Sequence, residues 1–363
     1  MSSDRIFAVL GAGNGGLAIA GHLALRGYDV RLWNRSPDTL AGLAGGRPLR
    51  LQGRVRGSAR ITVVTTDLAE AVTGAAAIMV VMPATAHRPL ARRLVEVVRP
   101  GQTIILNPGR TGGALEMDHL LRKLGCAGGV LVAEAQTLVF AARTVGPAVC
   151  HVFGMKRRVR LAALPAPATD QVLGLLSPAF PQFVAAEHVI ETSLANVGTV
   201  FHPGVALLNA SRIEATGGDF EYYREGITPM VSRVIRAVDE ERLGVARAYG
   251  VSIPSAREWL REAYGAEGDT LRQAVLSNPG YHGIKAPRHL DHRYIKEDVP
   301  TSLVPVSELG RLAGVGTPTV DGLIALSSAL HGVDYRREGR SAARMGIAGM
   351  TPAQILALVR DGR

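Results

Sequence analysis

A glycine-rich turn between a strand pattern and a helix pattern constrains the fold of this chain more than any other feature. The apolar run Ile6–Leu10 leads directly into Gly11-Ala12-Gly13-Asn14-Gly15-Gly16, which fits the pattern G-x-G-x-x-G. Alone the pattern is weak, but the helical sequence Leu17–Leu25 follows it, Gly27 ends that helix, and Asp29–Trp33 forms a second strand pattern. This order of strand, glycine turn, helix and strand is typical of a dinucleotide-binding fold.

Each glycine of the motif has a separate role in such a fold. Gly11 permits the tight turn, Gly13 lets the backbone approach a pyrophosphate, and Gly16 lets the helix and the strand pack closely. The helix that begins near Asn14 and Gly15 offers free N–H groups and a partial positive charge to the diphosphate. The alternative interpretation is a structural turn that binds no ligand.

The end of the second strand distinguishes the two nicotinamide cofactors. An acidic residue there would hydrogen-bond the ribose 2′-hydroxyl of NAD and repel a 2′-phosphate. This chain has Asn34, Arg35 and Ser36 at that point, which offer a positive charge and donors suited to phosphate. The sequence therefore favours NADP. In the alternative, Arg35 is a solvated surface residue and Asn34 accepts NAD without discrimination.

The first half of the chain alternates short β-branched apolar runs with helical patterns, which predicts an α/β fold with a doubly wound parallel sheet. The predicted strands lie near residues 5–10, 29–33, 61–65, 77–82, 102–106, 130–134 and 148–153, and the predicted helices near 14–26, 67–73, 86–98 and 114–124. We expect a Rossmann dinucleotide-binding domain over residues 1–180.

The second half changes character after Pro165-Ala166-Pro167, because strand patterns give way to long helical ones. Helices are predicted near 168–177, 187–213, 219–249, 254–264 and 306–331. We expect an all-helical domain over residues 181–363. An apolar stripe within 219–249 predicts packing on a helical core, and exposed helices such as this one would offer a face for a homodimer.

Composition excludes several classes of protein. The 363 residues carry a net charge of +10, but the arginines are spread along the chain without interleaved aromatic residues, which argues against a nucleic-acid partner. No apolar stretch approaches the roughly 20 residues of a membrane span. Ile6–Leu10 is too short for the apolar core of a signal peptide, so we expect a cytoplasmic protein. Cys126 and Cys150 lack metal-ligand spacing, and no metal is expected.

Two segments of the second half carry concentrated polar chemistry. In the segment from Asn196 to Pro203, a helical pattern is broken by Pro203, with His202 at the break. The segment from Arg293 to Pro300 places charges of both signs before a proline. Taken singly, the histidine would more often be a satisfied core residue and the charge run a solvated face.

Together with the glycine motif, these segments resemble the octopine/nopaline (opine) dehydrogenase family in order and spacing. Asn107-Pro108-Gly109 and the segment from Glu134 to Leu138 also look like motifs of that family. The resemblance implies a Rossmann domain followed by an all-helical domain like the C-terminal domain of 6-phosphogluconate dehydrogenase. It also implies the activity: condensation of a 2-oxo acid with an amino acid or amine, and reduction of the imine by NAD(P)H.

The chemistry of an imine reductase can be matched to residue types. Hydride transfer is favoured when the imine nitrogen is protonated, so a group that titrates near neutrality is needed, and His202 is the candidate. The resemblance assigns the carboxylate that orients His202 to Asp298. A guanidinium recognises the plane of a carboxylate, and we assign this role to Arg293. Thr137 and Glu134 are expected to hold the amino partner.

Two other functions stay open from the sequence alone. A ketopantoate-reductase-like 2-oxo-acid reductase would share the two-domain plan, but such enzymes use a lysine of the helical domain, and Lys285 and Lys296 lie outside the long helical patterns. A non-catalytic NADP-binding protein would keep the glycine turn but would not need His202 and Asp298.

Overall fold

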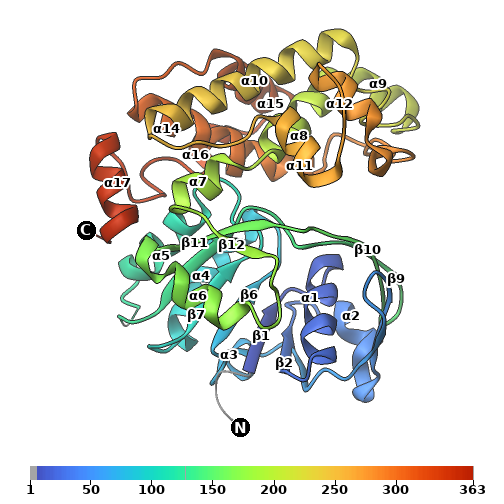
Figure 1. The fold of residues 1–363 in the computed structure, drawn as a ribbon, viewed down its shortest axis with the longest axis vertical. Coiled ribbons are helices and arrows are strands. Elements are labelled where there is room, and N and C mark those ends of the chain that lie inside the picture. The colour runs from blue at the N-terminus through green and yellow to red at the C-terminus, as the bar shows by residue number, and fades with distance from the viewer. Residues whose placement is uncertain (1–5, 127, 363) are drawn as a thin grey trace. The chain divides into compact units, whose positions relative to one another are not determined.

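The computed structural model describes residues 6–126 and 128–362, which form two compact units (Figure 1). The first unit contains the chain up to Gly109, residues Gly113–Thr192 and the end of the chain from Val359. The second contains Arg110–Gly112 and Ser193–Leu358. The main division therefore falls between Thr192 and Ser193, and three residues that follow a strand of the first unit belong to the second.

The first unit is built from short strands and helices that alternate along the chain. Its strands are β1 (Ile6–Leu10), β2 (Asp29–Trp33), β3 (Leu49–Gly53), β4 (Gly57–Ala59), β5 (Val63–Thr65), β6 (Ala77–Val80), β7 (Thr103–Leu106), β8 (Leu131–Ala135), β9 (Phe140–Gly146), β10 (Val149–Met155), β11 (Val159–Leu164) and β12 (Phe183–Ala185). Its helices are α1 (Asn14–Leu25), α2 (Pro37–Leu40), α3 (Leu68–Val72), α4 (His87–Val97), α5 (Gly113–Lys123) and α6 (Thr169–Leu176), and α7 (Val189–Leu194) spans the division.

The main sheet has eight strands in the order β12-β11-β8-β7-β6-β1-β2-β5. The six strands from β5 to β8 are parallel, and their order is that of a doubly wound dinucleotide-binding sheet. The order reverses between β1 and β6, so the crevice for a ligand lies beyond the carboxyl ends of these two strands. The predicted strands and helices of this sheet are confirmed, although residue 5 lies outside the described residues.

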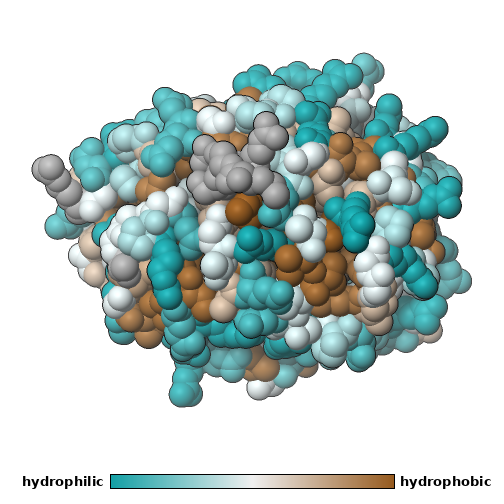
Figure 2. Space-filling view, turned by 90° about the horizontal axis from the view of Figure 1, so that it is seen from below, coloured by the Kyte–Doolittle hydropathy of each residue, from teal (hydrophilic) through white to brown (hydrophobic). Residues whose placement is uncertain are grey.

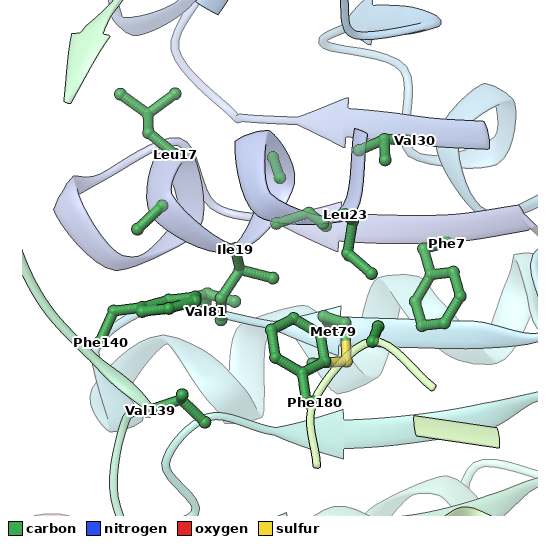
Figure 3. Packing of buried hydrophobic residues seen from close by; sticks show 14 of the residues in the cluster. Phe7, Leu17, Ile19, Leu23, Val30, Met79, Val81, Val139, Phe140 and Phe180 are labelled. Carbon is green, nitrogen blue, oxygen red and sulfur yellow. The ribbon is translucent and has the colours of Figure 1, made fainter. Parts of the chain in front are cut away.

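A second sheet of four strands, in the order β4-β3-β10-β9, was not predicted. The run near 148–153 is a strand, as expected, but it pairs in parallel with β3 and antiparallel with β9 instead of joining the main sheet. This sheet packs on α1. The core around α1 therefore receives Leu17, Ile19 and Leu23 from the helix and Phe140 from β9 (Figure 3).

The second unit is helical. Besides part of α7, it contains α8 (Gly198–Leu208), α9 (Ala210–Thr216), α10 (Pro229–Ala248), α11 (Ala256–Tyr264), α12 (Leu271–Ser277), α13 (Arg293–Lys296), the π-helical turn η6 (Val299–Leu303), α14 (Val304–Leu312), α15 (Pro318–His331), α16 (Tyr335–Glu338) and most of α17 (Pro352–Asp361). The helices predicted near 187–213 and 306–331 are interrupted. Residues 219–228, predicted as helix, precede α10 and are not helical.

The buried face of α10 differs from the predicted stripe. Met230, one of the apolar residues of the stripe predicted within 219–249, is 66% exposed, whereas Arg242 is fully buried. Arg242 can be buried because its guanidinium donates to Asp239 and to the carbonyl oxygens of Leu194 and Pro254.

Within residues 6–126 and 128–362, no helix is both long and apolar enough to cross a bilayer. On the face shown in Figure 2, hydrophilic side chains are distributed among smaller hydrophobic areas instead of gathering at one end.

The glycine turn supplies a stability prediction. A Cβ on Gly16 would lie 1.7 Å from the Gly11 carbonyl oxygen, so Gly16→Ala should lower the free energy of unfolding by roughly 3 kcal/mol through overpacking. Gly174→Ala in α6 is the matched control, because a Cβ there meets nothing within 4 Å and alanine is favoured in helices. Thermal unfolding of both variants decides the point; equal melting temperatures would contradict the close packing of Gly16.

Candidate active site

The glycine turn lies where the main sheet reverses its order. Gly11 has a φ of +113°, and a Cβ there would lie 2.3 Å from the Val81 carbonyl oxygen beyond β6. By contrast, a Cβ on Gly13 would meet nothing within 4 Å. Gly11 and Gly16 are therefore required by the protein itself, whereas the space at Gly13 is left open for a ligand.

The amino end of α1 fits the diphosphate of a dinucleotide. Gly13 precedes the helix with an extended backbone and no side-chain cap, and the first turn contains no acidic residue. The first N–H groups of the helix and its positive end therefore remain available to an anion. The side chain of Leu138 lies close to Gly15, and Asn14 Oδ1 accepts a hydrogen bond from the Thr144 N–H at 2.9 Å. The glycine turn and the first turn of α1 would hold the diphosphate of the cofactor.

The residues after β2 surround the same turn. Asn34 Oδ1 accepts from the Ala12 N–H at 3.1 Å, and its amide donates to the Ser36 carbonyl oxygen at 3.1 Å. Arg35 is exposed and Ser36 is half-buried. Asn34 therefore fixes the end of β2 against the glycine turn, and the neighbouring arginine is free to reach solvent or a ligand.

Glu134 and Thr137 lie at and beyond the end of β8. Glu134 is buried, and its two carboxylate oxygens accept from the Thr192 hydroxyl at 2.6 Å and from the Ala114 N–H at 2.8 Å. It thus holds the start of α5 and the end of the first unit. Thr137 is half-buried beside Leu138. Contact of either residue with an amino substrate stays a prediction.

The helical unit brings His202 and Asp298 together from positions 96 residues apart. His202 lies in α8, and Asp298 lies between α13 and the π-helical turn η6. The His202 Nδ1 and Asp298 Oδ2 atoms are 2.9 Å apart. Asp298 is fully buried, whereas the His202 side chain is 19% exposed. Asp298 therefore fixes one ring nitrogen and leaves Nε2 for chemistry.

Three more charged residues surround this pair. Arg110 Nη1 lies 3.1 Å from Asp298 Oδ1, and its Nε lies 3.4 Å from Glu297 Oε1. Arg293 Nη2 lies 3.0 Å from Glu297 Oε2, and its side chain is 54% exposed. Burial raises the pKa of Asp298, but the charges of Arg110 and His202 outweigh it and hold the pKa below its usual value. Asp298 is therefore an anion at neutral pH.

Two aromatic side chains pack around His202. The ring of Tyr294 stacks on the imidazole with ring centroids 4.3 Å apart, and Tyr222 lies 4.8 Å from Tyr294. The Tyr222 hydroxyl donates to the His202 carbonyl oxygen at 2.6 Å. Burial raises the pKa of Tyr222 well above its ordinary value, so it stays protonated as a donor. These contacts fix the imidazole plane.

The backbone around His202 differs from the predicted one. Pro203 does not break the helix: α8 runs through it from Gly198 to Leu208. The interruption lies earlier, after α7, where Asn196 Oδ1 accepts from the Gly198 N–H and its amide donates to Ser302 Oγ. The Asn196 side chain thus provides a hydrogen-bond acceptor for the Gly198 N–H, and the new helix α8 begins at that residue.

Sequence reasoning missed Arg110 and Tyr294 as parts of this site. Tyr294 is adjacent to the predicted Arg293, and Arg110 directly follows Asn107-Pro108-Gly109, so both lay next to quoted motifs. No local pattern shows that residue 110 reaches a carboxylate far along the chain.

The doubly wound sheet, the glycine turn and the helical unit with its histidine–aspartate pair define an NAD(P)-dependent dehydrogenase. Comparison with known proteins makes the class specific. Residues 185–331 match the family model of the NAD/NADP octopine/nopaline dehydrogenase α-helical domain, and residues 6–108 match the NAD-dependent glycerol-3-phosphate dehydrogenase N-terminus. The opine dehydrogenase of Arthrobacter sp. (strain 1C) is 41% identical over 360 residues, which cover 99% of this chain and 100% of the relative.

Solved structures agree in fold. Octopine dehydrogenase with NADH and L-arginine has a TM-score of 0.80 at 22% identity, covering 99% of this chain and 98% of that one. NADP⁺-bound yersinopine dehydrogenase has a TM-score of 0.76 at 17% identity, covering 99% of each chain. The chain therefore belongs to the octopine/nopaline dehydrogenase family and is an opine-dehydrogenase-type oxidoreductase that acts on CH–NH bonds. The expected fold class is confirmed.

The open space at Gly13 predicts a separation of cofactor binding from stability. Gly13 has φ −76° and ψ −173°, which alanine adopts without strain, so Gly13→Ala should fold normally. Its methyl group would occupy the space that the diphosphate approaches, and the Kd for NAD(P)H should rise by about tenfold or more, or about 1.4 kcal/mol. Fluorescence titration with thermal unfolding measures both; unchanged affinity would contradict this placement of the cofactor.

Proposed function

We propose that this chain joins a 2-oxo acid to an amino acid or amine and reduces the resulting imine to a secondary amine, with His202 as the acid–base group. Condensation of the two substrates releases water and forms the C=N bond. When bound, NAD(P)H supplies the hydride that the imine carbon accepts. His202 holds the proton at the imine nitrogen, and in the reverse direction it takes that proton from the amine.

The hydrogen bond between His202 Nδ1 and the buried Asp298 carboxylate carries this proposal. A carboxylate on one ring nitrogen selects the tautomer and stabilises the imidazolium, so that Nε2 can exchange a proton with the substrate. A buried structural histidine would not need a partly exposed ring, and His202 keeps 19% of its side chain exposed.

Arg293 is proposed to bind the carboxylate of the oxo acid. Its guanidinium is 54% exposed and contacts one oxygen of Glu297, which leaves further donors for a planar carboxylate. For Thr137, we propose a contact with the amino partner. For Glu134, whose oxygens already accept from Thr192 and Ala114, we propose that it supports this contact by holding the segment in place.

The experiment that tests the proposal is NAD(P)H oxidation with a matrix of 2-oxo acids against amino acids and simple amines. The proposed reaction requires both substrates together. Turnover with an oxo acid alone would instead identify a 2-oxo-acid reductase of the ketopantoate-reductase type, and no turnover with any pair would leave a cofactor-binding protein.

Replacement of the acid–base pair should remove turnover but not the fold. His202→Ala should lose the roughly 10²–10⁴-fold that general acid–base catalysis contributes, with NAD(P)H affinity nearly unchanged. Asp298→Asn should behave similarly, because a misoriented imidazole is almost as poor as a missing one. The double variant should be little worse than either single one, since the two residues act as a unit.

Kinetics per folded molecule, measured beside thermal unfolding, decide this prediction. His282→Ala is the matched control, because it removes a histidine of the same unit whose side chain is 73% exposed, and it should turn over normally. A His202→Ala variant with normal turnover per folded molecule would reject the assignment.

For the cofactor, we propose a preference for NADPH. Asn34, Arg35 and Ser36 lack the acidic residue that selects NAD, and Arg35 is exposed and able to contact a 2′-phosphate. The contact should favour NADPH by roughly 1–3 kcal/mol, or about five- to 150-fold in affinity. Arg35→Ala should remove most of this preference. Arg122→Ala removes an equally charged, exposed residue at the end of α5 and should leave it intact. Equal kcat/KM values for NADPH and NADH in the unmutated protein would refute the preference.

A further inference from the structure

Arg110 lies beyond the end of β7, in the short segment Arg110–Gly112 that belongs to the second unit. Its side chain is 8% exposed and lies between the carboxylates of Glu297 and Asp298. The Gly198 backbone approaches the same group, because a Cβ on Gly198 would lie 2.7 Å from Arg110 Nη1. The guanidinium is therefore packed between Glu297, Asp298 and the start of α8.

The backbone at Arg110 supports a specific role for the side chain. Its φ of +61° lies in the left-handed region, which is uncommon and strained for a residue other than glycine. Neighbouring bonds maintain this conformation: the Thr111 hydroxyl donates to the Ser193 carbonyl oxygen at 3.0 Å, and Arg340 donates to the Thr111 carbonyl oxygen at 2.7 Å. A glycine at this position would adopt the same conformation without strain. The presence of an arginine there indicates that its side chain has a role in the site.

The Asp298 carboxylate has two cationic neighbours and divides its oxygens between them. Oδ2 faces His202 Nδ1, and Oδ1 faces Arg110 Nη1. Without Arg110, the hydrogen-bond partners of Asp298 in the described residues would be His202 and the Ser302 hydroxyl, which lies 3.5 Å from Oδ1. The carboxylate would be less firmly oriented toward Nδ1. Its negative charge would also no longer be partly compensated by a neighbouring guanidinium.

We propose that Arg110 is a positioning residue that aims Asp298 at His202 and limits how strongly Asp298 retains the proton of His202; its effect on turnover rests on the proposed acid–base role of His202. Arg110 fixes Oδ1 so that Oδ2 meets Nδ1. Its positive charge also opposes the protonation of His202.

Several charged or titratable groups surround His202 and share in this balance. Arg110, Arg293 and His292 carry or can carry positive charge, and Glu297 and Asp298 carry negative charge. Tyr294 and Tyr222 face the ring and the helix of His202. Loss of Arg110 alone leaves two carboxylates and removes one buried cation, so His202 must become easier to protonate.

The test compares Arg110→Met with Arg110→Lys. In Arg110→Met, the pH midpoint of His202 titration should rise by about one unit, as expected when a like charge at close range is removed. Amine oxidation, which needs neutral His202, should then require more alkaline pH, and kcat should fall roughly 10- to 100-fold, as for other groups that orient a functional histidine. Arg110→Lys keeps the charge and should restore the midpoint while kcat stays reduced.

Arg242→Lys is the matched control. Arg242 is also a buried arginine of the second unit paired with an aspartate, but the two oxygens of Asp239 accept from Arg242 and from the Ala256 N–H at the start of α11, and not from His202. Arg242→Lys should lower the melting temperature and leave the pH profile unchanged. If Arg110→Met fails to fold, Arg110→Lys against Arg242→Lys still decides, because reduced stability alone lowers the folded fraction of a variant and leaves its kcat per folded molecule unchanged.

NMR titration of the His202 ring, assigned from the resonance lost in His202→Ala, separates this inference from the proposed function. The titration needs no substrate, so it reports on Arg110 even if His202 proves not to exchange the catalytic proton. An unchanged His202 midpoint in Arg110→Met would overturn the inference whatever the activity. A shifted midpoint with unaltered turnover would confirm the contact and reject the acid–base assignment.

Discussion

The charged and fully buried carboxylate of Asp298 is the interaction on which the helical unit's site depends. Transfer of a charged carboxylate from water into the protein interior costs several kcal/mol of free energy unless well-placed partners compensate for the lost hydration. His202 on α8 and Arg110 after β7 supply those partners, at 2.9 and 3.1 Å, and the Ser302 hydroxyl lies 3.5 Å from Oδ1 while it accepts a hydrogen bond from the Asn196 amide. Burial of Asp298 therefore requires that three segments distant in the sequence, those of Arg110, His202 and Asp298, come together. The π-helical turn that follows Asp298 is typical of functional positions, since it changes the direction of a side chain within a helix.

The first unit depends on a constraint of a different kind. Gly16 and Gly11 approach so closely that no side chain fits, and this steric requirement sets the angle at which α1 leaves β1. The helix consequently begins at the switch point with its N–H groups open. A steric constraint of this type acts between residues close in sequence, whereas the charge constraint at Asp298 acts between residues far apart.

That difference explains what could be predicted from the sequence. The glycine turn, α1 and β2 were found because every determinant lies within one short stretch. His202 and Asp298 are 96 residues apart, and their pairing was inferred only through family resemblance. Arg110 was missed because nothing near it indicates Glu297, 187 residues later. The second sheet was missed for the same reason: β10 pairs with β3, which is short and lies near the start of the chain.

The two arginines of the site, Arg110 and Arg293, differ in their exposure and in the number of carboxylates that they contact. Arg110, at 8% exposure, has both neighbouring carboxylates as partners, so an incoming anion would have to compete with them. Arg293 contacts Glu297, and its side chain is 54% exposed. With His202 neutral, the two arginines balance Glu297 and Asp298. An anionic substrate beside Arg293 would add one negative charge, and a protonated His202 would add one positive charge. If Arg293 binds a substrate carboxylate, as proposed, that binding and protonation of the histidine would therefore favour each other, because each would restore the neutrality that the other disturbs.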